Sequence, residues 1–246
     1  MKKVIFSIIM ILPFLLFAQT NRNSYSNQDS NTYELSIESG FGSYLMSNLK
    51  DLQSTIISKS EIPILRTTSF PSYFNYSIRF GRLINNSYLG LTGGLMSTGS
   101  RSSLSDYSGY YASDINCKAF NIGAYTRKAF ANYQLFKRPL EIGYVLNTSF
   151  LYSFVKMKDN LQLYGYDALI NDSYTFNSIG LYIEPMLYAA YMFNQHIGIE
   201  VNAGGALSIS SPLYYQKIKN EFVIYEKKRF ANWSGYRLSI GLISRF

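Results

Sequence analysis

Residues 233–246, with the sequence WSGYRLSIGLISRF, alternate between apolar and polar or small side chains almost without interruption. One face of this segment carries the apolar side chains Tyr236, Leu238, Ile240, Leu242 and Phe246. The other face carries Arg237, Arg245 and small residues. A period of two indicates a β-strand whose two faces meet different environments. A soluble sandwich rarely buries two arginines and exposes such an apolar row, whereas a membrane barrel has lipid outside and a polar lumen inside. The segment therefore predicts a strand of a transmembrane β-barrel.

The composition agrees with that prediction. The chain contains 23 Tyr and 17 Phe, and only 15% of its residues are charged. This balance suits a lipid-facing band between two aromatic belts. The net charge of +8 is too small and too unspecific to support nucleic-acid binding. Cys117 is the only cysteine, so no intramolecular disulfide can form, and we expect it to be a small apolar residue.

The N-terminus has the pattern of a secretory signal. Lys2 and Lys3 precede an apolar run from residue 4 to residue 17, and a cleavage site lies near Ala18-Gln19. An uncleaved anchor helix is the alternative, but the run is shorter than the roughly 20 apolar residues that a span needs. We expect a signal peptide at 1–18, a flexible periplasmic tail at 19–30 and a barrel at 31–246. The expected location is the outer membrane of a Gram-negative bacterium.

The alternation recurs along the rest of the chain. We expect eight strands, at about 32–46, 72–84, 87–98, 116–130, 140–154, 175–192, 196–210 and 233–246. The connections alternate in length. Asn85-Asn86, residues 131–139 and Asn194-Gln195 are short or moderate, whereas 47–71, 99–115, 155–174 and 211–231 are long. Because such barrels have short periplasmic turns and long extracellular loops, the fold class expected is an all-β, antiparallel, up-and-down barrel with four extracellular loops.

On these residues the chain resembles small bacterial outer-membrane barrels of the OmpA/OmpX type. The resemblance implies that the segment Tyr236, Leu238, Ile240, Leu242 and Phe246 is the signal read by the barrel-assembly machinery. Ser244 departs from the pattern, since the family usually has a large apolar or aromatic residue there. We expect this departure to affect how efficiently the barrel is assembled.

The charged residues of the strands are expected to face the lumen. By parity the inward set is Glu34, Glu38, Arg79, Arg127, Glu141, Glu184, Glu200, Arg237 and Arg245. A cation facing lipid at mid-depth costs about 2–4 kcal/mol, which explains this sorting. Lys118, Lys128 and Arg82 point outward at predicted strand ends, where their side chains can reach the interface. We expect contacts of Glu38 with Arg79 or Arg237, and of Arg127 with Glu141.

The lumen charges allow three interpretations. An eight-stranded barrel is just wide enough for side chains to fill it, so a salt-bridge network that closes the lumen is the favoured one. A narrow or gated pore, whose charges select ions, is the second. Catalytic use of the carboxylates is the least favoured.

The sequence contains no pattern of an active site. His196, the only histidine, follows the predicted periplasmic turn Asn194-Gln195, where a solvated side chain is the ordinary expectation. No nucleophile elbow, metal-ligand cluster or phosphate-binding loop is present. We therefore expect a protein that is not an enzyme and that needs no cofactor or metal.

Two of the long connections have notable patterns. The first contains Leu49, Leu52, Ile56 and Ile57 at near-helical spacing and predicts a short amphipathic helix on the barrel rim. The last carries the cations Lys217, Lys219, Lys227, Lys228 and Arg229 among aromatic residues. These cations predict contacts with phosphate groups of lipopolysaccharide, or with an unidentified protein or glycan. A plain hairpin extension of the two neighbouring strands is an equally weighted alternative.

The sequence leaves three hypotheses for function. The first is a barrel with a salt-bridge-filled lumen that serves the envelope structurally or interacts through its extracellular loops. The second is a narrow channel for ions or small solutes. The third is an accessory subunit of an envelope secretion or assembly machine. The partners expected are outer-membrane lipid, lipopolysaccharide and, during biogenesis, the barrel-assembly machinery.

Overall fold

The computed structural model describes residues 32–59, 64–165, 169–215, 223–224 and 227–246. The expected signal peptide (1–18) and periplasmic tail (19–30) lie outside the described residues. In the parts of the chain that are described, no helix is long and apolar enough to cross a membrane.

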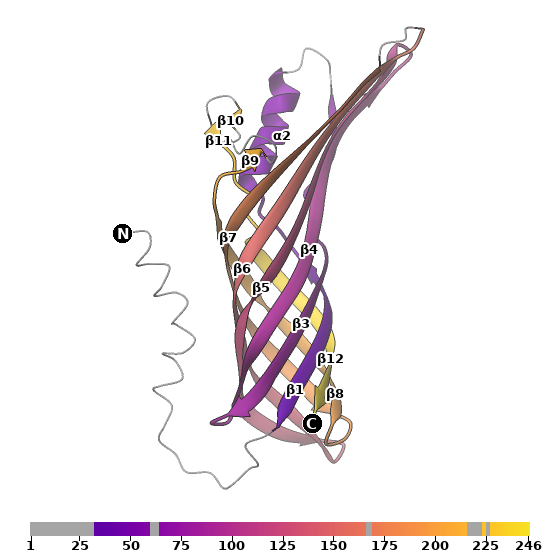
Figure 1. Ribbon diagram of the computed structural model, residues 1–246. Coiled ribbons are helices and arrows are strands. Elements are labelled where there is room, and N and C mark those ends of the chain that lie inside the picture. Colours follow the sequence, from indigo (N-terminus) through magenta and orange to yellow (C-terminus); the bar gives the residue numbers. More distant parts are fainter. Residues whose placement is uncertain (1–31, 60–63, 166–168, 216–222, 225–226) are drawn as a thin grey trace, which may run out of the picture.

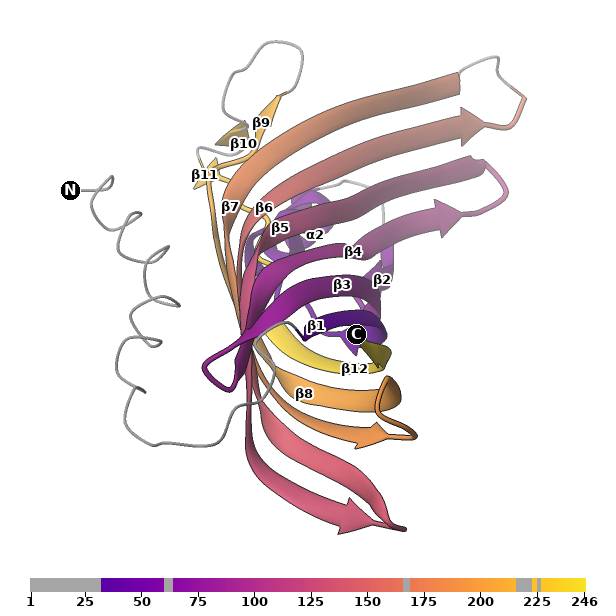
Figure 2. The same cartoon turned by 60° about the horizontal axis from the view of Figure 1, so that its bottom comes forward.

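Eight antiparallel strands close into a barrel (Figures 1 and 2). In order around the ring they are β1 (Tyr33–Gly42), β3 (Tyr73–Ile84), β4 (Ser87–Ser105), β5 (Gly109–Leu135), β6 (Arg138–Leu163), β7 (Leu169–Met192), β8 (Ile197–Ser210) and β12 (Gly235–Arg245). The first and last strands close the ring, with Glu34 opposite Arg245 and Gly42 opposite Arg237. The predicted fold class is confirmed.

Shorter elements gather at one end of the barrel (Figure 1). They are helix α2 (Ser47–Lys59) and strands β2 (Leu65–Ser69), β9 (Tyr214–Tyr215), β10 (Val223–Ile224) and β11 (Lys227–Lys228). Strand β2 pairs with the far end of β4, and β9 pairs with β7. The C-terminus lies at the other end, which by its short turns is the periplasmic end.

The periplasmic turns are tight because their residues adopt left-handed backbone conformations. Asn85 and Asn86 have φ angles of 47° and 62°, as expected of residues that tolerate this region well. Phe136 and Lys137 also have positive φ angles, 50° and 63°. The moderate connection predicted at 131–139 is therefore wrong, since β5 and β6 pair up to a two-residue turn, Leu135 facing Arg138.

The two loops predicted at 99–115 and 155–174 are also wrong, because both segments are largely strand. Strands β4 and β5 stay paired as far as Ser105 and Tyr110, and β6 and β7 as far as Gln162 and Leu169. The alternation continues there with its polarity reversed. Val155 is fully buried in the interior while Lys156 is exposed outside. The strands continue beyond the lipid into water. The lipid-facing pattern therefore ends before the strands do.

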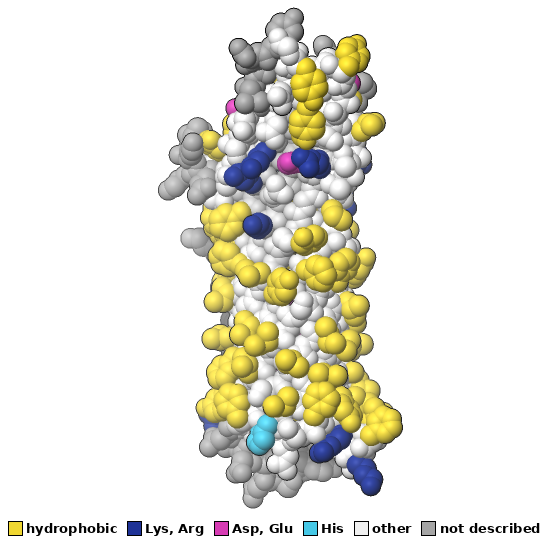
Figure 3. All heavy atoms as spheres, turned by 90° about the vertical axis from the view of Figure 1, so that its right-hand side faces the viewer, with side chains coloured by type: hydrophobic (Ala, Val, Ile, Leu, Met, Phe, Trp, Pro, Cys, Tyr) yellow, Lys and Arg dark blue, Asp and Glu magenta, His cyan; other side chains and the backbone are white. Residues whose placement is uncertain are grey.

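The outer surface carries a broad apolar band (Figure 3). It includes the following side chains, which are 49–66% exposed: Ile37, Phe74, Ile78, Leu91, Leu95, Ile122, Leu187, Leu238 and Leu242. An exposed apolar band of this extent is unfavourable in water and corresponds to the lipid-facing surface of a membrane barrel. The five residues predicted as an assembly signal lie on this outer face, 54–63% exposed. Their recognition by the assembly machinery stays a prediction.

An apolar core fills the extracellular half of the interior. Strand β1 ends at Gly42 rather than at the predicted Met46, and the following residues turn inward. Tyr44 and Trp233 meet there edge to face, with ring centroids 5.1 Å apart. The predicted helix is confirmed as α2, with Leu49 and Leu52 fully buried in this core. The helix thus helps to fill the mouth of the barrel.

Candidate functional site: the filled lumen

All nine charged residues predicted to face inward do line the interior, and they come from every barrel strand except β4. Glu34, Glu200, Arg79 and Arg127 are at most 1% exposed. Glu141, Glu184 and Arg245 retain 13–16% of their side-chain exposure. An unpaired charge in so narrow a space is costly, so the contacts between these groups decide what the lumen can do.

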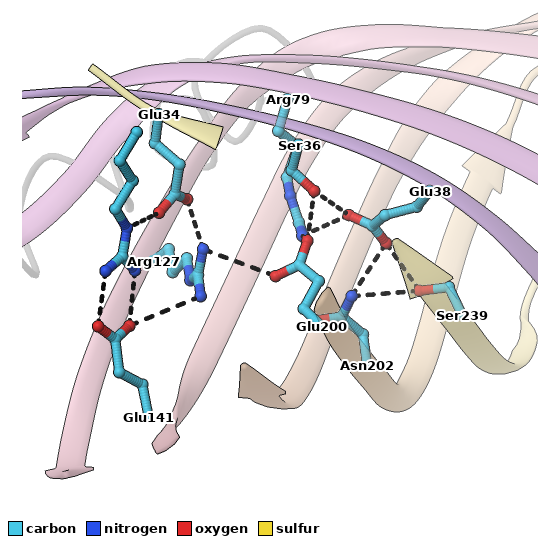
Figure 4. A network of polar contacts seen from close by, with 10 residues as sticks. Glu34, Ser36, Glu38, Arg79, Arg127, Glu141, Glu200, Asn202 and Ser239 are labelled. Atoms are coloured by element: carbon cyan, nitrogen blue, oxygen red, sulfur yellow. Dashed lines mark hydrogen bonds and ion pairs between the residues drawn. The ribbon is translucent and has the colours of Figure 1, made fainter. Parts of the chain in front are cut away.

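The periplasmic layer is centred on Arg245, which the sequence did not single out as a partner for any carboxylate. Its two terminal nitrogens each lie 2.6 Å from an oxygen of Glu141, and its Nε donates to Glu34 at 3.1 Å. Arg127 donates to Glu34 at 2.6 Å and stacks over the ring of Tyr188. The predicted pair, Arg127 and Glu141, is separated by 3.9 Å (Figure 4).

The middle layer continues the same chain of contacts (Figure 4). Arg127 lies 3.6 Å from Glu200, and Arg79 lies between Glu200, at 2.7 Å, and Glu38. Glu38 also accepts hydrogen bonds from Asn202 and Ser239. The partner of Glu38 is thus Arg79 and not Arg237, the other candidate. Alternating acids and bases run without a break from Glu141 to Glu38.

Arg237 joins the charged layers to the apolar core. Its Nε donates to Tyr182 at 3.0 Å, and Tyr182 donates to Glu184 at 2.9 Å. Its terminal nitrogens donate to the backbone carbonyls of Ser43, at 2.6 Å, and Trp233, at 2.9 Å. These two carbonyls belong to the segments that turn into the lumen. One guanidinium therefore holds both segments against the wall.

The two inward-turning segments touch at Gly235. A Cβ atom at this position would lie 2.2 Å from the carbonyl oxygen of Ser43, which is far inside van der Waals contact. Only glycine permits this approach. The fold of the mouth thus depends on a residue that the sequence pattern presents only as a small member of the inner face.

A polar cavity remains between the middle layer and Arg237. It is lined by Glu38, Asn75, Glu184 and Arg237, among others, and the space open to the centre of a water molecule is about 20 Å³. This is room for about one water molecule, with polar partners around it. Arg79 lies on the periplasmic side and the Tyr44–Trp233 pair on the extracellular side. The cavity is a small gap among the side chains that line the lumen.

The structure corrects one of the predicted loop-binding cations. Arg229 is 1% exposed, because it reaches back to α2 and pairs with Asp51 at 2.6 Å. It also donates to the backbone carbonyl of Asn48. Lys227 and Lys228 are exposed, and Lys217 and Lys219 lie outside the described residues. Spacing in the sequence gave no sign that the last loop would fold onto the first.

His196 is held in a periplasmic turn, at the lower end in Figure 3. Its backbone N–H donates to the side chain of Asn194 at 2.8 Å, and its Nδ1 lies 3.0 Å from the carbonyl oxygen of Arg245. These are turn contacts. Across the described residues, no three His, Cys, Asp or Glu side chains are grouped so that they could hold a metal ion.

Comparison with known proteins finds likeness in structure and not in sequence. No protein-family model and no curated protein matches the chain. Among solved structures, the attachment invasion locus protein Ail of Yersinia pestis is 12% identical, with 88% of this chain and 99% of that chain covered and a TM-score of 0.32.

Neisserial surface protein A is 11% identical (87% and 97% covered, TM-score 0.34). A major outer membrane protein from Thermus thermophilus is 12% identical (87% and 99% covered, TM-score 0.40). The closed strand order and the apolar band give this chain the architecture of a small outer-membrane β-barrel.

Replacing Arg237 tests the junction between the two halves of the filling. Arg237→Ala leaves Glu184 without its cation and frees the carbonyls of Ser43 and Trp233. We expect the free energy of unfolding in detergent to fall by about 3–5 kcal/mol, the usual cost of breaking a buried ion pair. Urea titration followed by tryptophan fluorescence measures this, since Trp233, the only tryptophan, lies in the affected core.

Two variants control for that loss. Arg101→Ala removes an ion pair with Asp114 whose arginine is 48% exposed, and should cost at most about 1 kcal/mol. Arg237→Lys keeps the charge but not the fork of donors, and should recover only part of the stability. An Arg237→Ala protein as stable as the wild type would show that the junction does not hold the mouth together.

The contact between Asp51 and Arg229 should make the docking of α2 depend on pH. The hydrogen bond from Arg229 lowers the pKa of Asp51 below its ordinary value. A carboxylate with a lowered pKa stabilises the folded state above its ordinary pKa, and that contribution disappears as the pH falls through the lowered value. Hydrogen exchange of α2 peptides, corrected for the intrinsic rate, should therefore show constant protection near neutrality and a loss in strong acid.

Asp51→Asn should reduce the protection of α2 at neutral pH and remove most of its change with acid. Asp114→Asn, which alters an ion pair on the outer wall, is the matched control and should leave α2 unaffected. If Asp51→Asn leaves the exchange of α2 unchanged at every pH, the Arg229 contact does not hold the helix.

Proposed function

We propose that this protein is an integral outer-membrane barrel with a closed lumen that interacts at the cell surface through its extracellular extension. One observation carries the proposal. Strands β4 to β7 continue beyond the apolar band as a four-stranded sheet, whose pairing runs out to Ser105 with Tyr110 and to Gln162 with Leu169. Figure 1 shows this sheet projecting from one side of the barrel. A rigid scaffold that projects into the medium is suited to recognition.

The contacts inside the barrel support a closed lumen. The charged layers form a continuous chain of ion pairs, and the core around Trp233 occupies the space above them. The remaining cavity holds about one water molecule. A channel needs a continuous wet path, so the channel hypothesis requires these contacts to open. The hypothesis of an accessory subunit stays a prediction, for which a co-purifying partner is the test.

The edge of the extension supports a surface role. Strand β7 pairs with β8 from Gly180 onward and with β9 at Phe176 and Asn177. Among the described residues, its segment 169–175 pairs only with β6. An edge with one side unpaired can accept an extended segment of another protein by β-augmentation. Asn171 and Ser173 are exposed and polar there, beside the exposed Tyr174, which suits a surface that stays in water until it binds.

Three further expectations belong to this proposal. The periplasmic end is the one with the short turns, which is consistent with insertion in the outer membrane of a Gram-negative bacterium. Each lumen carboxylate has an arginine within 4 Å, which leaves none of them ready for acid–base work and supports a role other than catalysis. The partner at the loops is a protein or glycan, and neighbouring lipopolysaccharide surrounds the barrel.

Shortening the extension tests the proposed role without disturbing the barrel. Lys158 and Ser173 already face each other, so replacing residues 159–172 by Asn-Gly joins them through a two-residue hairpin. Cells with the wild-type protein should adhere, to one another or to immobilised matrix proteins and glycans, at least about tenfold more than cells with the shortened protein, a difference of about 1.4 kcal/mol in binding. Heat-modified mobility in gels checks that both proteins form barrels.

A matched control changes the opposite end. Replacing Phe136-Lys137 by Asn-Gly alters a periplasmic turn of the same type and should leave adhesion unchanged. Equal adhesion by wild-type and shortened cells on every surface would contradict the proposed role of the extension, whatever the state of the lumen.

A further inference from the structure

A groove runs along the outer wall of β4, at the level where the apolar band ends. Its lower part has a volume of about 330 Å³ and is lined by Phe74, Leu95, Phe120 and Phe154. Its upper part, of about 510 Å³, is more polar than the lower part and includes Arg101. Both parts are lined by Ser97 and Lys118, so they form one groove that is almost wholly apolar below and mixed polar and apolar above.

The groove exists because β4 has small outward side chains at this height. Ser97 pairs with Lys118, and Gly99 pairs with Asn116, on the neighbouring strand β5. On the other side, β3 begins at Tyr73. Large side chains thus stand on both sides of a floor made by Ser97 and Gly99. The sequence pattern placed Ser97 near the end of a strand and Gly99 at the start of a loop.

Cations gather around the upper part. Lys118 is exposed, and the register brings Asn116 beside Lys156 and Asp114 beside Lys158. Asp114 is engaged by Arg101 at 3.2 Å. Within the described structure Lys118, Lys156 and Lys158 form no ion pair. On the face shown in Figure 3, basic side chains with one acid among them lie just above the apolar band. The local net charge is therefore positive and is not balanced by acidic side chains.

The depth of these cations is set by the aromatic residues beneath them. Phe120, Tyr152 and Phe154 form a contiguous cluster, with ring centroids 4.8–6.3 Å apart. Aromatic residues of membrane proteins concentrate at the boundary between hydrocarbon and headgroups. Lys118 and Lys156 therefore stand at headgroup level, where phosphate is the dominant anion, and a lysine near such a surface contributes about 1 kcal/mol to binding.

We propose that this groove binds one phosphate-bearing lipid of the outer leaflet. An acyl chain lies in the apolar part against Phe74, Leu95 and Phe120, and a phosphate group on the lipid contacts Lys118 and Lys156. The site lies on the outer wall of strands β3 to β6 and uses their side chains, whereas the proposed surface role rests on unpaired backbone groups of β7, so the site does not depend on that role. It would fix the lipid around the base of the extension.

Native mass spectrometry of the detergent-solubilised full barrel tests the proposal. The probes are diphosphorylated lipid A, the same lipid A without its phosphates, and inorganic phosphate. We expect one molecule of diphosphorylated lipid A per barrel. Lys118→Gln with Lys156→Gln should weaken its binding by about 25-fold, about fivefold for each lysine. Lipid A without its phosphates should bind the wild-type protein about as weakly as diphosphorylated lipid A binds the double variant.

Two further variants separate the parts of the site. Ser97→Phe fills the floor of the groove without a change of charge and should weaken lipid binding while the barrel still shows its heat-modified mobility. Lys128→Gln with Arg138→Gln removes two outward cations at the periplasmic end and should leave the binding unchanged. Equal binding of lipid A by the Lys118, Lys156 double variant and by the wild type would overturn the proposal. Binding of inorganic phosphate as tight as that of lipid A would overturn it as well.

Discussion

The structure depends on one constraint, which is that the interior of an eight-stranded barrel has no room for charges without partners. Seven of the strands each bring at least one charge inward, and each charge finds its counterion on another strand. The chain from Glu141 through Arg245, Glu34, Arg127, Glu200 and Arg79 to Glu38 is the result. Every ion pair in this chain joins residues far apart in sequence. The network therefore connects the strands across the lumen, in addition to the backbone hydrogen bonds that connect neighbouring strands in the wall. Arg237 stabilises the mouth of the barrel in a similar way, because it donates hydrogen bonds to the backbone carbonyls of Ser43 and Trp233.

A second organising feature is the reversal of polarity along single strands. On strand β6 the outer face changes from Phe154 to Lys156, while the inner face changes from Ser153 to Val155. The same reversal occurs on β5 between Phe120 and Lys118. It lets continuous strands serve as membrane wall below and as a water-exposed sheet above. The boundary also places cations over aromatic rings, which gives the outer wall its amphiphilic groove.

The part of the fold that lies in lipid could be predicted from sequence, because lipid outside and charges inside impose a strict alternation on each strand. The inward position of all nine charges followed from parity alone. Two predicted contacts, Glu38 with Arg79 and Arg127 with Glu141, are also present. The closest partner of Glu141 is Arg245, which was not predicted, since height around a tilted ring depends on the shear of the sheet. The extension was not predicted because its apolar side chains face inward and its polar side chains face outward, the reverse of the pattern in lipid. The alternation of Val155 and Met157 with lysines could have indicated it. The burial of Arg229 against Asp51 was unpredictable, since it depends on two loops far apart in sequence meeting over the mouth.

Electrical recording from the barrel of residues 19–246 in a planar bilayer tests most directly whether the lumen is closed, as we propose. The wild-type barrel should carry no discrete current, because the ion pairs and the core around Trp233 leave no continuous wet path. Glu38→Gln, which unpairs one side of Arg79 in the middle layer, should allow brief leak events. Steady, discrete currents from the wild-type protein would contradict the account and would make the same charges the selectivity filter of a channel.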